Sequence, residues 1–194
     1  MEDLYRRRIT IDEWHRIVDA GIFPENERLE LIRGEILRVP PFGDRDAPVI
    51  VPRHAGCVRR LNRQFCLRLT SGAIVDVQSP ILWNEKNSAP QPDVALLRFR
   101  DDLYSAVLPI PTDILLVIEV SNSDLIYERD TKLPLYSEAG IPEAWLADLN
   151  SDTIFVHRRP SPEGYRDVRA YRRGETIYPE AFPETGFAVD EILG

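Results

Sequence analysis

Glu119 and Lys132 are the first residues whose types and surroundings suggest chemistry. Glu119 lies in the run from Ile114 to Val120, which is otherwise entirely apolar. A run without alternation is typical of a strand that is buried on both faces of a sheet. A buried carboxylate without a partner would cost roughly several kcal/mol, so Glu119 needs a hydrogen-bonding partner, a counter-charge or a metal ion. A paired structural carboxylate is the simplest of these interpretations.

A second carboxylate, Asp93, stands at the start of another short apolar run. This run extends to Leu97 and follows Pro92, a position that favours the beginning of a strand. The sequence therefore predicts two strands that each carry one acidic residue.

Lysine is rare in this chain. Lys86 and Lys132 are the only lysines among the 24 basic residues, and the others are arginines. Arginine is effectively never deprotonated and has a different shape, so a site that requires a compact amine cannot use it. Either Lys132 has a role that needs lysine, or codon bias favours arginine and two lysines remain by accident.

At these positions the chain resembles the PD-(D/E)XK superfamily of restriction-endonuclease-like proteins, and within it the bacterial family of Uma-type candidate endonucleases. The resemblance runs from about Thr10 to the C-terminus. The matching positions are Glu30-Leu31-Ile32, Gly34-Glu35, His54, Pro92-Asp93, Glu119-Val120, Ser123-Asp124, Lys132-Leu133-Pro134-Leu135-Tyr136, Ala139-Gly140-Ile141-Pro142-Glu143 and Trp145.

The resemblance implies metal-assisted hydrolysis of a phosphodiester bond, with DNA as the expected substrate. Such a site uses oxygen ligands for Mg2+ or Mn2+, and Asp93, Glu119 and the backbone carbonyl of Val120 would supply them. Lys132 would compensate charge in the transition state or orient the attacking water. Where the superfamily motif has its lysine, two residues after the strand glutamate, this chain has Ser121, and Lys132 matches the family's lysine on the following helix.

Glu30 and His54 complete the set of expected catalytic residues. Glu30 matches a family position near the site and could contact the metal through water. His54 begins a helix and could bind a phosphate or assist water, although a histidine there is more often only hydrogen-bonded. Tyr136 lies one helical turn after Lys132, where core packing competes with a hydrogen bond inside the site.

The charge of the chain limits how it could bind nucleic acid. A formal net charge of -8 argues against indiscriminate binding, because such binding depends on cationic side chains that release counterions from phosphates. Two segments are nevertheless rich in arginine, from Arg53 to Arg68 and from Arg158 to Arg173. These arginines form either a local basic surface or merely a solvated exterior.

The remaining pattern predicts a single domain over residues 1–194 with a mixed α/β (α+β) fold. We expect a mixed central sheet flanked by helices and preceded by an N-terminal helix and a β-hairpin. The expected helices are residues 10–21, with an apolar stripe of Trp14, Ile17 and Val18, residues 54–69, and a segment from Lys132 to Gly140. The expected strands are residues 28–39 as the hairpin, 73–83, 93–97, 114–120, 143–149, 153–159 and 165–171, and residues 40–52 are an expected loop.

Cys57 and Cys66 lie nine positions apart on one expected helix, on opposite faces, and we interpret both as reduced core residues. No apolar run approaches the length that spans a membrane, and the N-terminus lacks the apolar region of a signal peptide, so we expect a cytoplasmic protein.

Two functions from different classes fit this sequence. The first is a metal-dependent endonuclease that acts on DNA, possessing Asp93, Glu119 and Lys132 as its chemical groups. The second is a catalytically idle relative whose sheet serves nucleic-acid binding or oligomerisation. Retention of all three groups favours the first function. We also expect a homodimer, since closed symmetry is common among enzymes.

Overall fold

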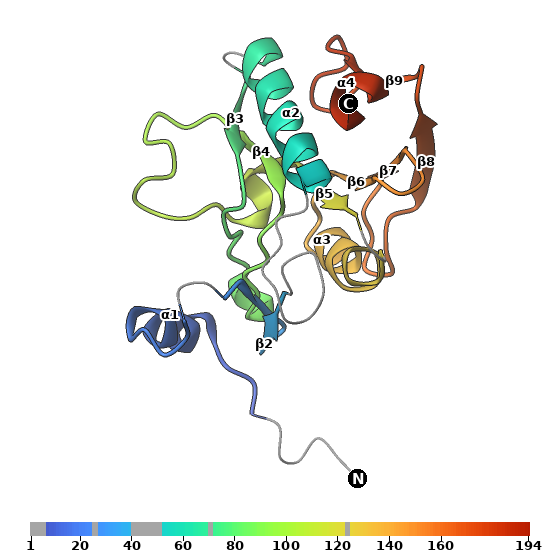
Figure 1. Cartoon of the computed structure of the whole chain (residues 1–194). Helices are drawn as coiled ribbons and strands as arrows, with labels where there is room; N and C mark the ends of the chain where they lie inside the picture. The colour runs from blue at the N-terminus through green and yellow to red at the C-terminus, as the bar shows by residue number, and fades with distance from the viewer. Residues whose placement is uncertain (1–6, 25–26, 40–51, 70–71, 123–124) are drawn as a thin grey trace.

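The computed structural model describes residues 7–24, 27–39, 52–69, 72–122 and 125–194. A six-stranded sheet with the order β3-β4-β5-β6-β7-β8 forms its centre (Figure 1). The strands are β3 (Ala73–Asp76), β4 (Val94–Arg98), β5 (Ile114–Ser121), β6 (Glu143–Asp148), β7 (Thr153–Arg158) and β8 (Asp167–Arg172). Neighbouring strands are antiparallel except β5 and β6, which are parallel, so the predicted mixed sheet is confirmed.

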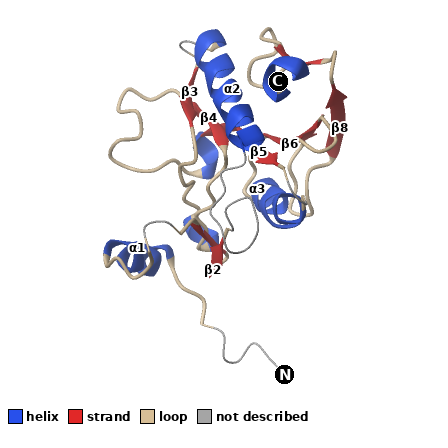
Figure 2. Cartoon of the chain, in the orientation of Figure 1, coloured by secondary structure: helices blue, strands red, loops and turns tan. Residues whose placement is uncertain are grey.

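Helices cover both faces of this sheet (Figure 1, Figure 2). Helix α2 (Pro52–Arg68) packs on one face together with the C-terminal α4 (Val189–Leu193) and the short hairpin of β9 (Thr176–Ile177) and β10 (Phe187–Ala188). Helix α3 (Leu133–Glu138) packs on the other face. Successive residues of a strand point to opposite faces, and accordingly Leu116 and Ile118 pack under α2 whereas Val117 packs under α3.

The N-terminal helix and hairpin form as the sequence predicts. Helix α1 (Ile11–Asp19) begins with a capping box, in which Thr10 and Glu13 bond each other's backbone amides. The hairpin pairs β1 (Leu29–Ile32) with β2 (Glu35–Arg38) and contacts the rest of the chain through a bridge between Leu31 and Ala89. The predicted apolar stripe of α1 is only partly buried, because Trp14 is 8% exposed but Val18 is 50% exposed.

Three expectations need correction. The strand predicted over residues 73–83 ends at Asp76, because Gln78 takes a positive φ of 55° and Pro80 cannot donate to a ladder. Cys66 is exposed, since the face of α2 opposite the buried Cys57 points away from the sheet. Helix α2 begins at Pro52, before His54; the rest of the loop predicted over residues 40–52 lies outside the described residues.

The helix expected around Lys132 is confirmed, but it begins differently. Residues Glu128–Lys132 form a π-helical segment, and α3 continues from Leu133 with Pro134 in its first turn. Gly140 follows the helix with a φ of 75°, which is the left-handed conformation that glycine adopts without strain. Single π-helical turns of this kind are frequent at functional sites, because they shift the side chains that follow.

The turn of the β1–β2 hairpin allows a test of the fold. Arg33 and Gly34 both have positive φ, and a Cβ on Gly34 would lie 2.7 Å from the Cβ of Arg8 and 3.0 Å from the carbonyl oxygen of Ile9. We expect Gly34→Ala to lower the free energy of unfolding by about 1–3 kcal/mol more than Gly174→Ala does. Gly174 has a similar φ of 85° with nothing within 4 Å of the added carbon, so it controls for backbone strain.

Urea denaturation of the two variants measures this difference. Equal losses of unfolding free energy in both would show that the N-terminal segment does not pack against the hairpin turn.

Candidate active site

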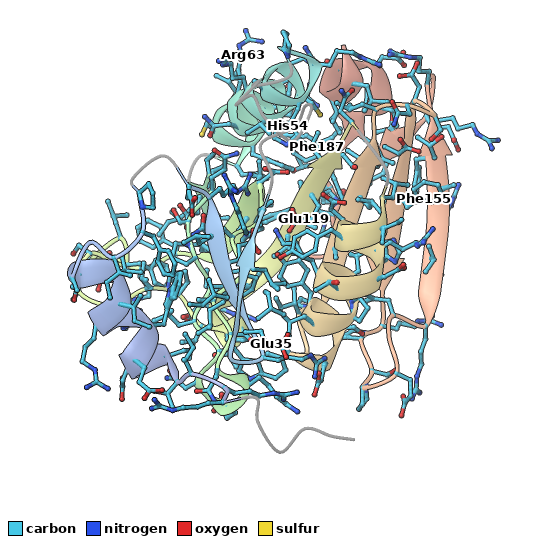
Figure 3. All side chains as sticks on the ribbon, turned by 60° about the horizontal axis from the view of Figure 1, so that its bottom comes forward. Glu35, His54, Arg63, Glu119, Phe155 and Phe187 are labelled. Atoms are coloured by element: carbon cyan, nitrogen blue, oxygen red, sulfur yellow. The ribbon has the colours of Figure 1, made fainter. Side chains whose placement is uncertain are left out.

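Neighbouring strands bring Asp93 and Glu119 together, as the sequence predicts. The register of β4 and β5 pairs Val94 with Ile118, which places Asp93 opposite Glu119 just beyond the end of β4. Strand alternation directs the side chain of Glu119 to the face that carries α3, whereas Asp93, just outside β4, contacts His54 of α2; each acidic residue is 2% exposed. Figure 3 shows Glu119 between the hairpin and α3, with His54 on α2 nearby.

Three donors surround the carboxylate of Asp93. Its Oδ2 lies 3.0 Å from Nε2 of His54 and accepts a 3.0 Å hydrogen bond from the backbone amide of Val120. Its Oδ1 accepts a 3.2 Å bond from the side-chain amide of Gln78, which the positive φ at that residue orients. Val120 therefore contacts Asp93 through its amide, and because both main-chain groups of a strand residue point the same way, its carbonyl faces this side too.

The pKa of Asp93 is lowered to about 2. Burial alone would raise this pKa, but the hydrogen bond and charge of His54 and the charges of Arg28 and Lys132 together outweigh burial. Asp93 is consequently an anion at any pH at which the protein could function.

Glu119 has the opposite shift. Its Oε1 lies 2.7 Å from Nζ of Lys132 and accepts a 2.6 Å hydrogen bond from the hydroxyl of Tyr136. Burial raises the pKa of Glu119 to about 8; the charges of Asp93 and Glu30 add to this effect, and Lys132 opposes it. Tyr136 is thus both a core residue, at 1% exposed, and a hydrogen-bonding member of the site.

Lys132 is the cation at the centre of the site. It is 2% exposed, and its Nζ lies 2.7 Å from Glu119, 3.4 Å from Glu30 and 2.8 Å from the backbone carbonyl of Gln91. Burial opposes its charge, yet the carboxylates of Glu119, Glu30 and Asp93 raise the pKa of Lys132 above its ordinary value. The amine therefore stays protonated, which suits electrostatic stabilisation and excludes a role as a base.

Glu30 reaches this amine from the hairpin. It is fully buried on β1, and its Oε2 accepts a 3.1 Å hydrogen bond from the hydroxyl of Tyr127, just before the π-helical segment. The structure thus joins all five predicted site residues, with His54 contacting Asp93 and Glu30 contacting Lys132. Their catalytic roles stay predictions.

Arg28 belongs to the site, although the sequence analysis did not select it. Its NH2 donates a 3.2 Å hydrogen bond to the carbonyl of Gln91 and lies 3.7 Å from Asp93 and 3.9 Å from Glu30. These carboxylates raise the pKa of Arg28, even though burial lowers it. The available signal was spacing, because Arg28 precedes Glu30 by two residues and so lies on the same face of the extended chain.

The donor atoms of this centre suit a hard cation. Asp93 and Glu119 provide carboxylate oxygens, and the pKa of Glu119 is raised first by burial and then by the charges of Asp93 and Glu30, against the opposing effect of Lys132. Among the residues that the structure describes, no three histidine, cysteine, aspartate or glutamate side chains are grouped so that they could hold a metal ion. Two carboxylates, a carbonyl and water would therefore have to complete the coordination.

The arginines of α2 are largely used inside the chain. Arg53 pairs with Asp152 at 3.3 Å, Arg60 donates to the carbonyl of Ile192, and Arg68 pairs with a glutamate of α4. Arg60 and Arg68 thus bind the C-terminal segment and Arg53 binds the turn between β6 and β7, which leaves fewer of these arginines for a free basic surface.

Comparisons with known proteins place this chain in a family and show a similar fold. Residues 11–190 match the model of the Uma2 family, which is described as "Putative restriction endonuclease". A crystal structure from Anabaena variabilis, described as "a putative nuclease belonging to DUF820", has a similar fold, with a TM-score of 0.69 at 14% sequence identity. The similarity covers 95% of this chain and 97% of the other. No curated protein matches this sequence significantly.

The family match confirms the resemblance inferred from the sequence and supports a nuclease-like function, and the shared fold confirms the predicted fold class. The metal, the DNA substrate, the homodimer and the single-domain boundary stay predictions. None of the described helices is long and apolar enough to cross a membrane.

The raised pKa of Glu119 predicts a pH dependence of stability. The pKa rises from an ordinary 4.5 to about 8 on folding, so the folded state keeps a proton that the unfolded state loses between these values. This stabilisation is complete below about pH 4.5 and is lost as the pH rises through about 8. Glu119→Gln removes the titration and keeps an oxygen acceptor for Lys132 and Tyr136. We expect this variant to gain stability relative to the wild type as the pH rises.

Urea denaturation in chelator at about pH 5, 7 and 9 measures this trend. Glu184→Gln, at an exposed position, serves as the control. Its unfolding free energy should differ from that of the wild type by the same amount at every pH. His157, whose pKa burial lowers to about 4, contributes equally to all three proteins. If the difference in unfolding free energy between Glu119→Gln and the wild type does not change with pH, the raised pKa of Glu119 is contradicted.

Proposed function

The chain belongs to the Uma2 family, and we propose that it is a metal-dependent endonuclease that hydrolyses phosphodiester bonds in DNA. The observation that carries this proposal is the position of Lys132, whose buried amine lies 2.7 Å from Glu119 in the same centre as Asp93. A protonated amine beside two acidic residues on neighbouring strands is suited to phosphoryl chemistry, since it adds positive charge where the transition state gains negative charge.

Asp93, Glu119 and the carbonyl of Val120 would hold the Mg2+ or Mn2+ ion. Bound there, such an ion would polarise the phosphate and lower the pKa of the attacking water. Asp93 is ready for this role because its low pKa keeps it anionic. Glu119 would lose its proton when positive charge approaches, since its pKa is raised by burial and by neighbouring carboxylates.

Glu30 acts on Lys132, and His54 acts on Asp93. Glu30 contacts Lys132 at 3.4 Å and the carbonyl of Gln91 contacts it at 2.8 Å, so together they orient the amine toward Glu119. His54 holds one oxygen of Asp93 at 3.0 Å and thereby orients the carboxylate. We assign both Glu30 and His54 as positioning residues.

The idle-relative hypothesis has one observation in its favour, because the described residues contain no preformed group of three side-chain ligands. Direct measurement of metal binding and of cleavage separates the two functions.

Metal binding is the first of these measurements. We expect Asp93→Asn and Glu119→Gln each to weaken Mn2+ binding by at least about tenfold in calorimetric titration, because each removes an anionic oxygen ligand. Asp167→Asn, on the exposed start of β8, is the control and should bind as the wild type does. Unchanged affinity in both site variants would contradict the assignment of the ligands.

Cleavage by Lys132 variants is the second measurement. We expect Lys132→Met and Lys132→Arg to lose roughly a hundredfold or more in cleavage rate while still binding Mn2+, because one well-placed electrostatic group is worth about that much. Arginine keeps the charge but not the size or placement of the amine. Lys86→Arg is the matched control, since Lys86 pairs with Glu138 at 2.5 Å on the surface and arginine can replace it.

The comparison is made on folded protein, verified by thermal melting, with several DNA forms and both metals. Equal rates for the wild type and Lys132→Met would show that the amine is not catalytic. Absence of cleavage by the wild type under every condition would favour the idle relative.

A further inference from the structure

A cavity of about 460 Å³ lies between α1 and the beginning of the hairpin, next to the carboxylate centre. Its wall includes Trp14 and Val18 from α1, Phe23 from the connection that follows, and Arg28 and Gln91 from the side of the centre. This volume lies within the range of pockets that bind small organic groups. Val18 belongs to the apolar stripe of α1 but is half exposed, and its position in the wall of this cavity accounts for that exposure.

The cavity and the centre share two residues. The carbonyl of Gln91 accepts hydrogen bonds from Nζ of Lys132 at 2.8 Å and from NH2 of Arg28 at 3.2 Å. Arg28 also lies 3.7 Å from Asp93, and its side chain is 26% exposed. A ligand in the cavity would therefore lie beside the guanidinium that borders the catalytic carboxylates.

The wall of the cavity is suited to a nucleobase and not to a phosphate. Phe23, which is partly buried, provides aromatic surface and packs beside the buried Trp14 with ring centroids 6.4 Å apart, and bases stack on aromatic surfaces whatever their sequence. Asp19 and Glu27 also line the wall, where their carboxylates would repel a phosphate but accept hydrogen bonds from the amino groups of a base. Arg28 is the cation of the wall, at the end nearest the centre.

We propose that this cavity takes one unstacked nucleobase of a single-stranded nucleic acid, while Arg28 contacts the phosphate that enters the neighbouring centre. The inference rests on the proposed endonuclease function and narrows its substrate class to single strands or unpaired ends. A base inside a duplex cannot enter a cavity without leaving the stack. The net charge of -8 agrees with a single-stranded substrate. Duplex binding needs many contacts between cationic side chains and phosphates, whereas stacking of bases on aromatic side chains makes binding depend less on such contacts.

Filling the cavity tests the proposal. We expect Val18→Trp to weaken binding of a fluorescent single-stranded oligonucleotide by roughly tenfold, because the new ring takes the place of the base. Val168→Trp is the matched control: Val168 is 52% exposed, against 50% for Val18, and it lies on edge strand β8 at the far side of the sheet. Binding is measured by anisotropy in chelator and again in Ca2+, with the same sequence as a duplex for comparison.

A selective loss of single-strand binding in Val18→Trp supports the proposal. Equal single-strand affinity for Val18→Trp and Val168→Trp overturns it, and so does a wild type that binds the duplex more tightly than the single strand. An oligonucleotide with one abasic position gives an independent arm, since removal of the base should weaken binding to the wild type but not to Val18→Trp.

Failure of the inference and failure of the proposed function are distinguishable. If Val18→Trp cleaves single strands at the wild-type rate, the cavity does not bind the base, although the chain is an endonuclease. If the wild type never cleaves but its binding responds to Val18→Trp and not to Val168→Trp, the cavity binds a base and the endonuclease proposal fails.

Discussion

The buried contact of the Lys132 amine with Glu119 is the interaction on which the rest of the site depends. Moving the charged amine out of water costs roughly several kcal/mol, and only good geometry and further hydrogen bonds compensate for this cost. Here the amine also contacts Glu30 and the carbonyl of Gln91, and Glu119 accepts a bond from Tyr136. The buried amine is stabilised only where Glu119, Glu30 and the carbonyl of Gln91 meet around it, so this contact constrains three separate parts of the chain to lie together.

A different interaction holds each of these three parts, the sheet, the π-helical segment and the hairpin, in position. The sheet fixes Glu119 because β5 is buried on both faces and paired with β4 and β6. The π-helical segment Glu128–Lys132 directs the amine inward from the other layer. The hairpin contributes Glu30 from outside the main sheet, held by a bridge at Leu31. A centre assembled from sheet, helix and hairpin exists only when all three are docked, which joins the chemistry of the site to the integrity of the fold.

The sequence identified those groups whose burial is predicted by the residues next to them. Glu119 and Asp93 interrupt or open apolar runs, and Lys132 is notable because lysine is so rare. Arg28 was missed because arginines are common in this chain and two of its partners, Gln91 and Asp93, lie more than sixty residues away. The carbonyl of Gln91 was missed for a different reason, since a backbone acceptor carries no side-chain signature. The strand after Asp76 was extended too far because its residues alternate well, whereas Gln78 takes a positive φ and its side chain contacts Asp93, outside this segment.

Ser121 indicates why the amine approaches from the helix. It follows Glu119 by two residues on the same face of β5, is fully buried, and its hydroxyl has no hydrogen-bond partner among the described residues. A lysine at this position would bring its amine along the strand. With the small serine there, the amine comes from the π-helical segment, where Glu30 and Gln91 can also hold it. The hairpin is thereby drawn into the site, and with it Arg28 and the neighbouring cavity, so the position of the amine connects the cavity to the carboxylates of Asp93 and Glu119.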